Sequence, residues 1–533
     1  MLVKTFRILT LVSIFALTFA YAPEAMAGSN ACDSRVNNTQ KKLLECVTVE
    51  GVREHQAAFQ AIADANGGVR AAGTPGYDAS LDYVVAKMTA AGYNVSVNAF
   101  PFVYVALPTL QQTAPISASY ETGAFTGTGY GNVSGNVTAI DINLVPPRAS
   151  SSGCDGAFTE AFVGAPIVPD PGGPDDFAGF TAGNIALIQR GTCSFALKAT
   201  NAVAAGASAV IIFNQGNTPT REGLIIGTLA PFVASIPVVG ASFANGAALS
   251  QPGSTASITL APPQNVTQYN VIAESKDGDP NNVVMAGAHL DSVQRGPGIQ
   301  DNGSGSAALL EVAEQMAKVK PRNKVRFAWW GAEEAGLIGS NAYVAGLSAE
   351  ERQKIALYLN FDMIGSPNHV FFIYDGDDSD AVGAPAGPPG SAEIEKTFEA
   401  FFNMRGLPFK GTDFSGRSDY GPFIAVGIPS GGLFTGAEGI KTAAEAALWG
   451  GTAGQQYDPC YHLACDTFAN INLTALDVNS DAVAFSVLQY AMNTSDINGA
   501  KGKGNFPPLS GGGAVPGNGS QSGLHDDHEL ESE

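Results

Sequence analysis

Residues 283–319 combine a strand, a polar turn and a helix in an order that constrains the fold of the whole chain. The apolar run 283–288 leads into the turn 289–305, HLDSVQRGPGIQDNGSG, and residues 306–319 have helix-like character. Open α/β sheets place their sites where buried parallel strands end. A histidine, two aspartates and several glycines at this point therefore indicate a metal site at the carboxyl end of a buried strand.

Strand-like and helix-like segments alternate on both sides of this stretch. We expect strands at 94–105, 269–275, 283–290, 324–331, 355–361, 369–374 and 429–434, and helices at 51–66, 77–91, 304–319, 338–347, 391–405 and 474–492. Such alternation predicts an α/β fold with a mixed, mostly parallel sheet covered by helices on both faces.

The sequence changes character between residues 106 and 266, where Pro, Gly, Ser and Thr become frequent. A chain of 533 residues is too long for one ordinary core. Residues 185–188 and 209–213 read as buried strands joined by a helix, and no ionisable cluster accompanies them. We expect a β-rich insert at 106–266 that divides one α/β domain into the parts 28–105 and 267–497.

Neither end of the chain has the sequence pattern of a folded domain. Residues 1–27 contain Lys4 and Arg7, an apolar run and a small-x-small site, which is typical of a cleaved signal peptide. A membrane anchor is the alternative, but the run is short for a span of roughly 20 residues. Residues 498–533 are rich in Gly, Pro and Ser and predict a disordered tail. We expect a secreted or periplasmic protein with no membrane span in its mature form.

The cysteines indicate whether disulfides form, and the net charge indicates which partners the protein can bind. Six cysteines in an exported chain favour disulfides, and their grouping predicts Cys32–Cys46, Cys154–Cys193 and Cys460–Cys465. A zinc–thiolate site is the alternative. The formal net charge of −21 would repel nucleic acids and anionic membranes, so we expect neither as a partner. It favours cationic substrates such as free amines.

Further acids follow the ends of other predicted strands, and a second histidine lies in a predicted disulfide loop. Glu333 and Glu334 follow one strand, Asp362 follows the next, and His462 lies inside the predicted disulfide loop. Each is more often structural than catalytic when it stands alone. The combined ligand inventory is His289, Asp301, Glu334, Asp362 and His462. Two histidines with three carboxylates suit a pair of zinc ions better than calcium or magnesium.

Two further acids have roles that do not require metal binding. Asp291 lies two residues after His289 on a strand end, so the two side chains share a face. Asp291 can then accept a hydrogen bond from the second ring nitrogen of the histidine and fix its tautomer. Glu333, left over from the ligand set, can act as a general base.

Six motifs carry a resemblance to a known family. AGAHLDS, DNGSGSA, WWGAEEAGLIGS, NFDMIGSPN, FSGRSDYGPF and CYHLACD occur in the order of the secreted two-zinc aminopeptidases, the family of the leucyl aminopeptidases of Streptomyces and Vibrio. The resemblance covers about 50–102 and 265–492. It implies a zinc exopeptidase fold and removal of an N-terminal residue, leucine or another apolar one, from peptides with a free N-terminus. We expect a monomer.

The resemblance also implies a role for each matched residue. His289 and Asp362 would bind one zinc ion, Glu334 and His462 the other, and Asp301 would bridge both.

The remaining matches concern catalysis and substrate. Glu333 would be the general base and Asp291 the carboxylate behind the histidine. Tyr461 would stabilise the oxyanion, and Arg417 would lie beside the far end of the substrate. Asp362 and Glu333 are negative and could face the ammonium group of the substrate.

Two further matches concern calcium and the insert, and the match of the insert covers about 130–260. Asp477 and Asp481 match a calcium-binding pair in one relative, and the alternative is a solvated helix face. The insert resembles a protease-associated domain on Gly153–Cys154 and on residues 186–195 and 205–214. In relatives this module lies beside the active site and carries no catalytic residue.

The same scaffold leaves other functions open. It also serves glutamate-releasing carboxypeptidases, single-zinc glutaminyl cyclases, and receptors that have lost metal ligands. All five ligands and the base are present here, which favours an enzyme.

Overall fold

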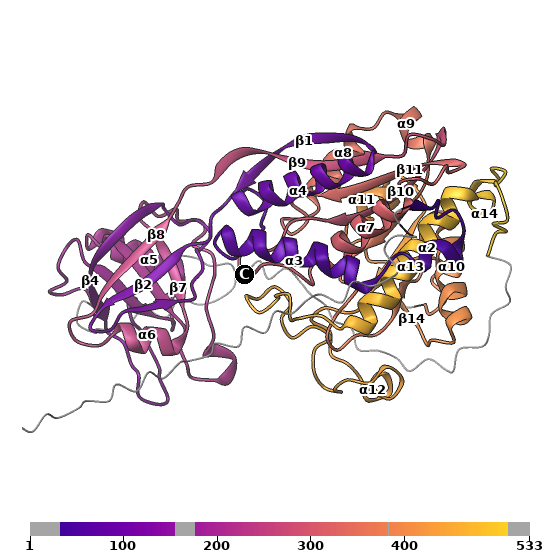
Figure 1. Cartoon of the computed structure of the whole chain (residues 1–533). Coiled ribbons are helices and arrows are strands. Elements are labelled where there is room, and N and C mark those ends of the chain that lie inside the picture. The colour runs from indigo at the N-terminus through magenta and orange to yellow at the C-terminus, as the bar shows by residue number, and fades with distance from the viewer. Residues whose placement is uncertain (1–31, 33, 155–175, 382, 510–533) are drawn as a thin grey trace, which may run out of the picture.

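A computed structural model describes residues 32, 34–154, 176–381 and 383–509 of the chain. The predicted signal peptide and residues 510–533 of the predicted tail lie outside these ranges. The described chain forms two lobes, of which the larger contains the metal-site motifs (Figure 1). None of the helices in the described part of the chain has both the length and the apolar character that a membrane crossing needs.

An eight-stranded sheet forms the centre of the larger lobe. In spatial order its strands are β1 (Asn94–Tyr104), β9 (Gln264–Glu274), β11 (Asn323–Trp330), β10 (Asp279–His289), β12 (Ile355–Phe361), β15 (Ser430–Phe434), β13 (Phe372–Tyr374) and β14 (Lys410–Thr412). The four central strands β11, β10, β12 and β15 are parallel, whereas β1, β9 and β13 introduce antiparallel pairs. The mixed sheet confirms the predicted fold class.

Helices cover both faces of this sheet. One face is covered by α2 (Gln40–Leu44), α3 (Val49–Ala65), α4 (Pro75–Ala91), α7 (Gly303–Met316), α10 (Ser391–Arg405) and α13 (Leu473–Met492). The other face carries α8 (Ile338–Gly346), α9 (Ala349–Lys354) and α11 (Gly421–Ala425). The short helices α12 (Ala443–Trp449) and α14 (Ser495–Asn498) complete the lobe.

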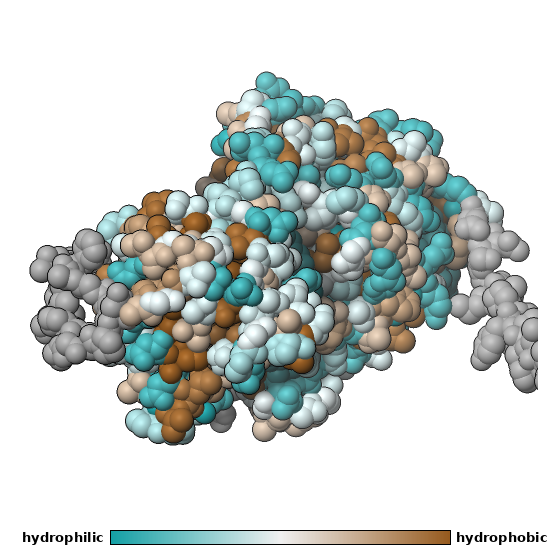
Figure 2. Space-filling view, turned by 90° about the vertical axis from the view of Figure 1, so that its left-hand side faces the viewer, coloured by the Kyte–Doolittle hydropathy of each residue, from teal (hydrophilic) through white to brown (hydrophobic). Residues whose placement is uncertain are grey.

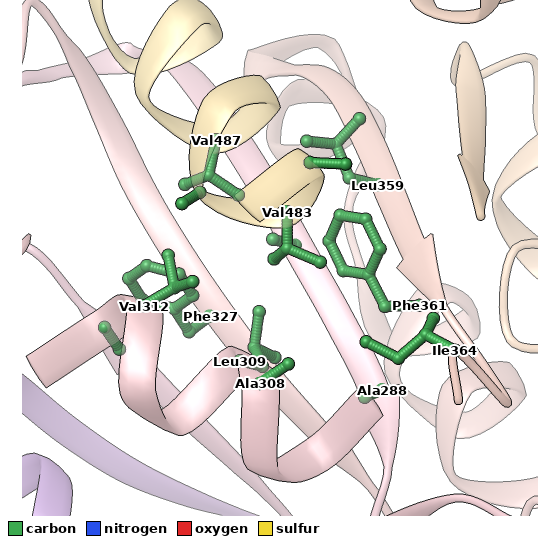
Figure 3. Close-up of a cluster of buried hydrophobic side chains, with 14 of the residues drawn as sticks. Ala288, Ala308, Leu309, Val312, Phe327, Leu359, Phe361, Ile364, Val483 and Val487 are labelled. Atoms are coloured by element: carbon green, nitrogen blue, oxygen red, sulfur yellow. The ribbon is translucent and has the colours of Figure 1, made fainter. Parts of the chain in front are cut away.

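The carboxyl-terminal halves of the central strands β10 and β11 are mostly apolar, as expected for strands that are buried on both faces. On β11, Phe327 and Trp329 join the core cluster on one face, and Ala328 and Trp330 join the cluster on the other. This follows from the two-residue period of side chains along a strand. Figure 3 shows the first face, where Leu309 of α7 and residues of α13 meet the side chains of β11 and β12.

The smaller lobe is the insert, whose two ends are brought together by the larger lobe. Strand β1 pairs with β9 in register from Asn94–Glu274 to Tyr104–Gln264, so the chain leaves and returns at one place. The insert contains β2 (Thr109–Ala114), β3 (Ala118–Tyr120), β4 (Gly131–Ile140), β5 (Ile185–Gln189), α5 (Phe195–Ala204), β6 (Ala209–Phe213), the 3-10 helix η1 (Pro219–Arg221), β7 (Val238–Ala241), α6 (Phe243–Leu249) and β8 (Thr255–Leu260). Its strand order is β3-β2-β8-β4-β5-β6-β7.

The surface of the insert carries exposed apolar side chains. Figure 2 views the molecule from the side of the insert and shows hydrophobic side chains gathered in patches on it. Val145, Ile226 and Val233 are among its exposed apolar residues.

Three disulfides connect the described cysteines. They are Cys32–Cys46, Cys154–Cys193 and Cys460–Cys465, with Cα–Cα distances of 5.5, 5.7 and 5.3 Å. Because the chain has six cysteines, these pairs use all of them. The zinc–thiolate alternative is therefore excluded.

The core between α7 and the sheet makes a stability prediction. Leu309 is fully buried, so Leu309→Ala is expected to lower the free energy of unfolding by about 2–5 kcal/mol. Leu448 is 61 % exposed and provides the control. Leu448→Ala is expected to change the free energy of unfolding by at most about 0.5 kcal/mol. Urea denaturation followed by tryptophan fluorescence measures this lobe, because Trp329, Trp330 and Trp449 all belong to it. An equal loss of unfolding free energy in the two variants would contradict the placement of Leu309 in the core.

Candidate metal centre

The parallel strands β10, β11 and β12 end at the same edge of the sheet, and the predicted ligands lie there. His289 is the last residue of β10, Glu333 and Glu334 follow β11, and Asp362 follows β12. His462 reaches the same place from the loop closed by the Cys460–Cys465 disulfide. The structure therefore brings together side chains that are up to 173 positions apart between His289 and His462.

A close helix–strand contact brings Asp301 to this edge. Asn302 caps α7 by accepting a hydrogen bond from the backbone N–H of Gly305 at 2.9 Å. A Cβ atom on Gly305 would collide with the backbone oxygen of Phe361 at the end of β12. Glycine is needed at this position because only its absent side chain lets the start of α7 approach the strand that carries Asp362.

The backbone turns sharply at or near three of the predicted ligands, Glu334, Asp362 and His462. Ala332, Met363 and His462 have φ values of 56°, 52° and 57°, in the left-handed region that non-glycine residues rarely adopt. Such a conformation costs roughly 1–2 kcal/mol per residue. Backbone strain of this kind is concentrated at functional sites, where it directs side chains that a regular strand or turn would not place.

Asp301 lies between the two histidines. Its Oδ1 is 3.2 Å from Nε2 of His289, and its Oδ2 is 3.2 Å from Nε2 of His462. Each oxygen of one carboxylate thus faces a different imidazole. This is the arrangement that a carboxylate bridging two metal ions requires.

One further carboxylate completes each half of the centre. Asp362 Oδ1 is 3.2 Å from Nε2 of His289, and Glu334 Oε2 is 3.0 Å from Nε2 of His462. Zinc bonds of about 2.0–2.2 Å in a tetrahedron place neighbouring ligand atoms about 3.3 Å apart. The observed separations are close to this value, so both halves have the dimensions of a zinc site.

Two carboxylate oxygens of the centre lack a hydrogen bond. Asp362 Oδ1 and Glu334 Oε1 are buried and make no hydrogen bond. Burial raises the pKa of Glu333 well above its ordinary value, and burial with the nearby Asp301 raises the pKa of Glu334 to about 7. Several carboxylates with too little positive charge around them need a cation, and the nitrogen and oxygen donors fit zinc.

Asp291 lies behind the centre, where it contacts both the ring of His289 and the turn after β11. Its backbone oxygen is 3.1 Å from Nδ1 of His289, and its carboxylate Oδ1 is 3.7 Å from the same nitrogen. The carboxylate also accepts hydrogen bonds from the backbone N–H groups of Glu333 and Glu334, at 3.1 and 3.3 Å. The sequence indicated only the contact with the histidine. The structure adds that Asp291 holds the turn after β11.

Two positioning residues were not identified from the sequence. Asp466 accepts hydrogen bonds from the backbone N–H groups of Gln300 and Asp301, at 2.8 and 3.0 Å. Ser418 donates a hydrogen bond of 2.7 Å to Asp362 Oδ2. Both lie inside quoted motifs, CYHLACD and FSGRSDYGPF, so their motif position was the available signal.

Tyr461 and Arg417 lie on the same side of the centre. The ring of Tyr461 stacks on that of His462, with centroids 3.8 Å apart. Burial raises the pKa of Tyr461, and the charges of Asp301 and Glu334 raise it further, so its hydroxyl keeps its proton and can donate. Arg417 is largely exposed, and its Nη1 lies 3.6 Å from Oε1 of Glu438.

The calcium prediction receives no support from the geometry. Asp481 forms an ion pair with Arg405, whose guanidinium already supplies positive charge. Asp477 lies one helical turn before it on α13 and is exposed.

Comparisons with known proteins agree with this centre. Residues 270–487 match Peptidase family M28, and residues 140–249 match the PA domain. An aminopeptidase of Pseudomonas aeruginosa is 50 % identical over 471 residues, which cover 86 % of this chain and 84 % of that protein. A probable leucine aminopeptidase 2 of Aspergillus fumigatus is 47 % identical over 331 residues, 60 % of this chain and 65 % of that protein.

A solved structure agrees in fold. The structure of a zinc aminopeptidase from Bacillus subtilis has a TM-score of 0.55 at 24 % identity and covers 83 % of this chain and 94 % of its own. The relatives named above are aminopeptidases, which favours this activity over the carboxypeptidase, cyclase and receptor alternatives. The chain therefore belongs to peptidase family M28 and is a zinc-dependent aminopeptidase with a PA-domain insert.

Proposed function

We propose that this aminopeptidase removes an apolar N-terminal residue, preferably leucine, from peptides outside the cytoplasm, and that it uses two zinc ions. The single observation that carries the two-zinc proposal is the position of Asp301, whose two oxygens face His289 and His462 at equal distances. The preference for leucine rests on the similarity to leucine aminopeptidase 2 of fungi. The disulfides are consistent with an extracellular location.

The ligand atoms divide into two sets that share one carboxylate. His289 and Asp362 would hold one ion, Glu334 and His462 would hold the other, and Asp301 would contact both. Bound zinc supplies Lewis acidity and lowers the pKa of water to about 7. Asp291 and Asp466 would keep this arrangement in place through the backbone groups that they bind.

Glu333 is suited to move the proton. Its Oε2 is 3.8 Å from Nε2 of His289, so it lies beside the centre, while its side chain is 11 % exposed. The carboxylate would take a proton from the attacking water and return it to the leaving amine. The phenol of Tyr461 would donate a hydrogen bond to the carbonyl oxygen as negative charge develops there.

The negative charge beside the centre accounts for recognition of a free amine. Glu333 and Asp362 approach the same ring nitrogen of His289, at 3.8 and 3.2 Å. Their carboxylates would attract the ammonium group of the substrate and thereby fix the first residue. Arg417, on the exposed side, would lie beside the far end of the substrate. We propose that the enzyme acts in this way as a monomer.

Hydrolysis of leucyl-p-nitroanilide tests the proposal. The mature protein is expected to release p-nitroaniline, to lose this activity with a chelator, and to recover it with zinc. N-acetyl-leucyl-p-nitroanilide is expected to remain intact, because its blocked nitrogen cannot carry the charge that the carboxylates attract. A zinc-loaded protein that hydrolyses both substrates, or neither, would rule the proposal out.

A variant separates metal binding from proton transfer. Glu333→Gln keeps the size of the side chain but removes its basic oxygen, so kcat is expected to fall about 10²–10⁴-fold. Zinc content, measured by mass spectrometry, is expected to stay at the wild-type level. Glu350→Gln, at an exposed position of α9, is the matched control and is expected to change neither quantity. Wild-type turnover in Glu333→Gln would refute its role as the base.

A further inference from the structure

An open pocket of ≈ 290 Å³ lies beside the metal centre. Its lining includes Glu334 and His462, which belong to one half of the centre, but not His289, Glu333 or Asp362. The pocket therefore borders one side of the centre only. Its volume is near the lower limit of about 300 Å³ for small-molecule sites, so it suits a short piece of peptide.

Most of the pocket wall is apolar. Ala71, Phe102, Leu107 and Val293 contribute to it. Phe102 is nearly buried at the end of β1, whereas Leu107 is 42 % exposed in the linker that leads from β1 into the insert. An apolar side chain placed here would remove its own surface and that of Leu107 from water, which is favourable.

The linker is held at the pocket by the loop that follows β10. The side chain of Gln294 donates a hydrogen bond of 2.8 Å to the backbone oxygen of Val105 and accepts one of 3.1 Å from the N–H of Leu107. The next residue, Arg295, forms an ion pair of 3.0 Å with Glu121 of the insert. One loop thus lines the pocket and holds the linker, so this wall exists because the chain departs here for the insert.

We propose that this pocket receives the side chain of the residue that follows the scissile bond and selects an apolar residue there. The inference rests on the proposed function, in which Glu333 and Asp362 face the ammonium group. The pocket borders the other half of the centre, at Glu334 and His462. The part of the peptide beyond the scissile bond points away from the ammonium group and therefore enters this pocket.

The apolar wall of the pocket disfavours an acidic side chain. A carboxylate placed against Phe102, Leu107 and Val293 would lose water without gaining a hydrogen-bond partner from them. The guanidinium of Arg295, which also lines the pocket, is already paired with Glu121. The expected order of preference for the second residue is apolar, then neutral polar, then acidic.

Leucyl dipeptide amides provide the test. Their second residue is Leu, Phe, Asn or Asp, and leucinamide serves as the reference because it places nothing in the pocket. With the zinc-loaded full-length protein, the ratio of kcat/KM for each dipeptide amide to that for leucinamide is measured. The ratio is expected to be at least about 10-fold higher for Leu and Phe than for Asp, as burial of a large apolar side chain predicts.

Variants of the linker residue test the wall itself. Leu107→Asp is expected to reduce the preference for Leu over Asp at least about 10-fold, whereas Leu107→Met retains it. Leu448→Asp, at an exposed leucine outside the pocket, is the matched control and is expected to retain the preference.

The outcomes separate the two proposals. If leucinamide is hydrolysed but all second residues give equal ratios, the inference is wrong and the proposed function stands. The inference is equally wrong if Leu107→Asp lowers kcat/KM by the same factor for every substrate. A zinc-loaded protein that hydrolyses none of the substrates overturns the proposed function and the inference with it.

Discussion

Asp301 imposes the electrostatic constraint on which the rest of the centre depends. Its buried carboxylate faces two histidines, and Glu333, Glu334 and Asp362 bring further negative charge to the same place. Buried charges that lack partners cost several kcal/mol each. Under the proposed function, bound zinc would offset this negative charge and would thereby also stabilise the fold around the centre.

The surrounding polar groups hold both the backbone and the side chains of the centre, as the hydrogen bonds of Asp466 and Ser418 show. Asp466 fixes the N–H of Asp301, and Asp291 fixes the N–H groups of Glu333 and Glu334. At a metal site, the loss of such a supporting contact typically costs about 10–100-fold in metal affinity or activity.

The long central strands were predictable from sequence, whereas contacts between distant segments were not. Residues 283–288 form a continuous apolar run and residues 355–361 a run with the single amide Asn360, as expected for strands buried on both faces, and that pattern is local. Strand β14 has three residues and no such pattern, so it was missed. The wall formed by Leu107 depends on a hydrogen bond to Gln294, 187 residues away, and no local signal predicts it.

The ligand set shows the same division. Each of His289, Glu334, Asp362 and His462 is predictable as a polar residue after an apolar run or inside a disulfide loop, but their convergence follows from the parallel order of β11, β10 and β12. The bridging role predicted for Asp301 rests on the resemblance to a family, because spacing alone does not orient a carboxylate. The structure supplies the missing element, which is the contact of Gly305 with the end of β12.

The most direct test of the central claim is an anomalous difference map at the zinc absorption edge from crystals of the zinc-loaded protein. We predict two peaks roughly 3.5–4 Å apart, one beside each carboxylate oxygen of Asp301. A single peak, or two peaks of which only one contacts Asp301, would contradict the account.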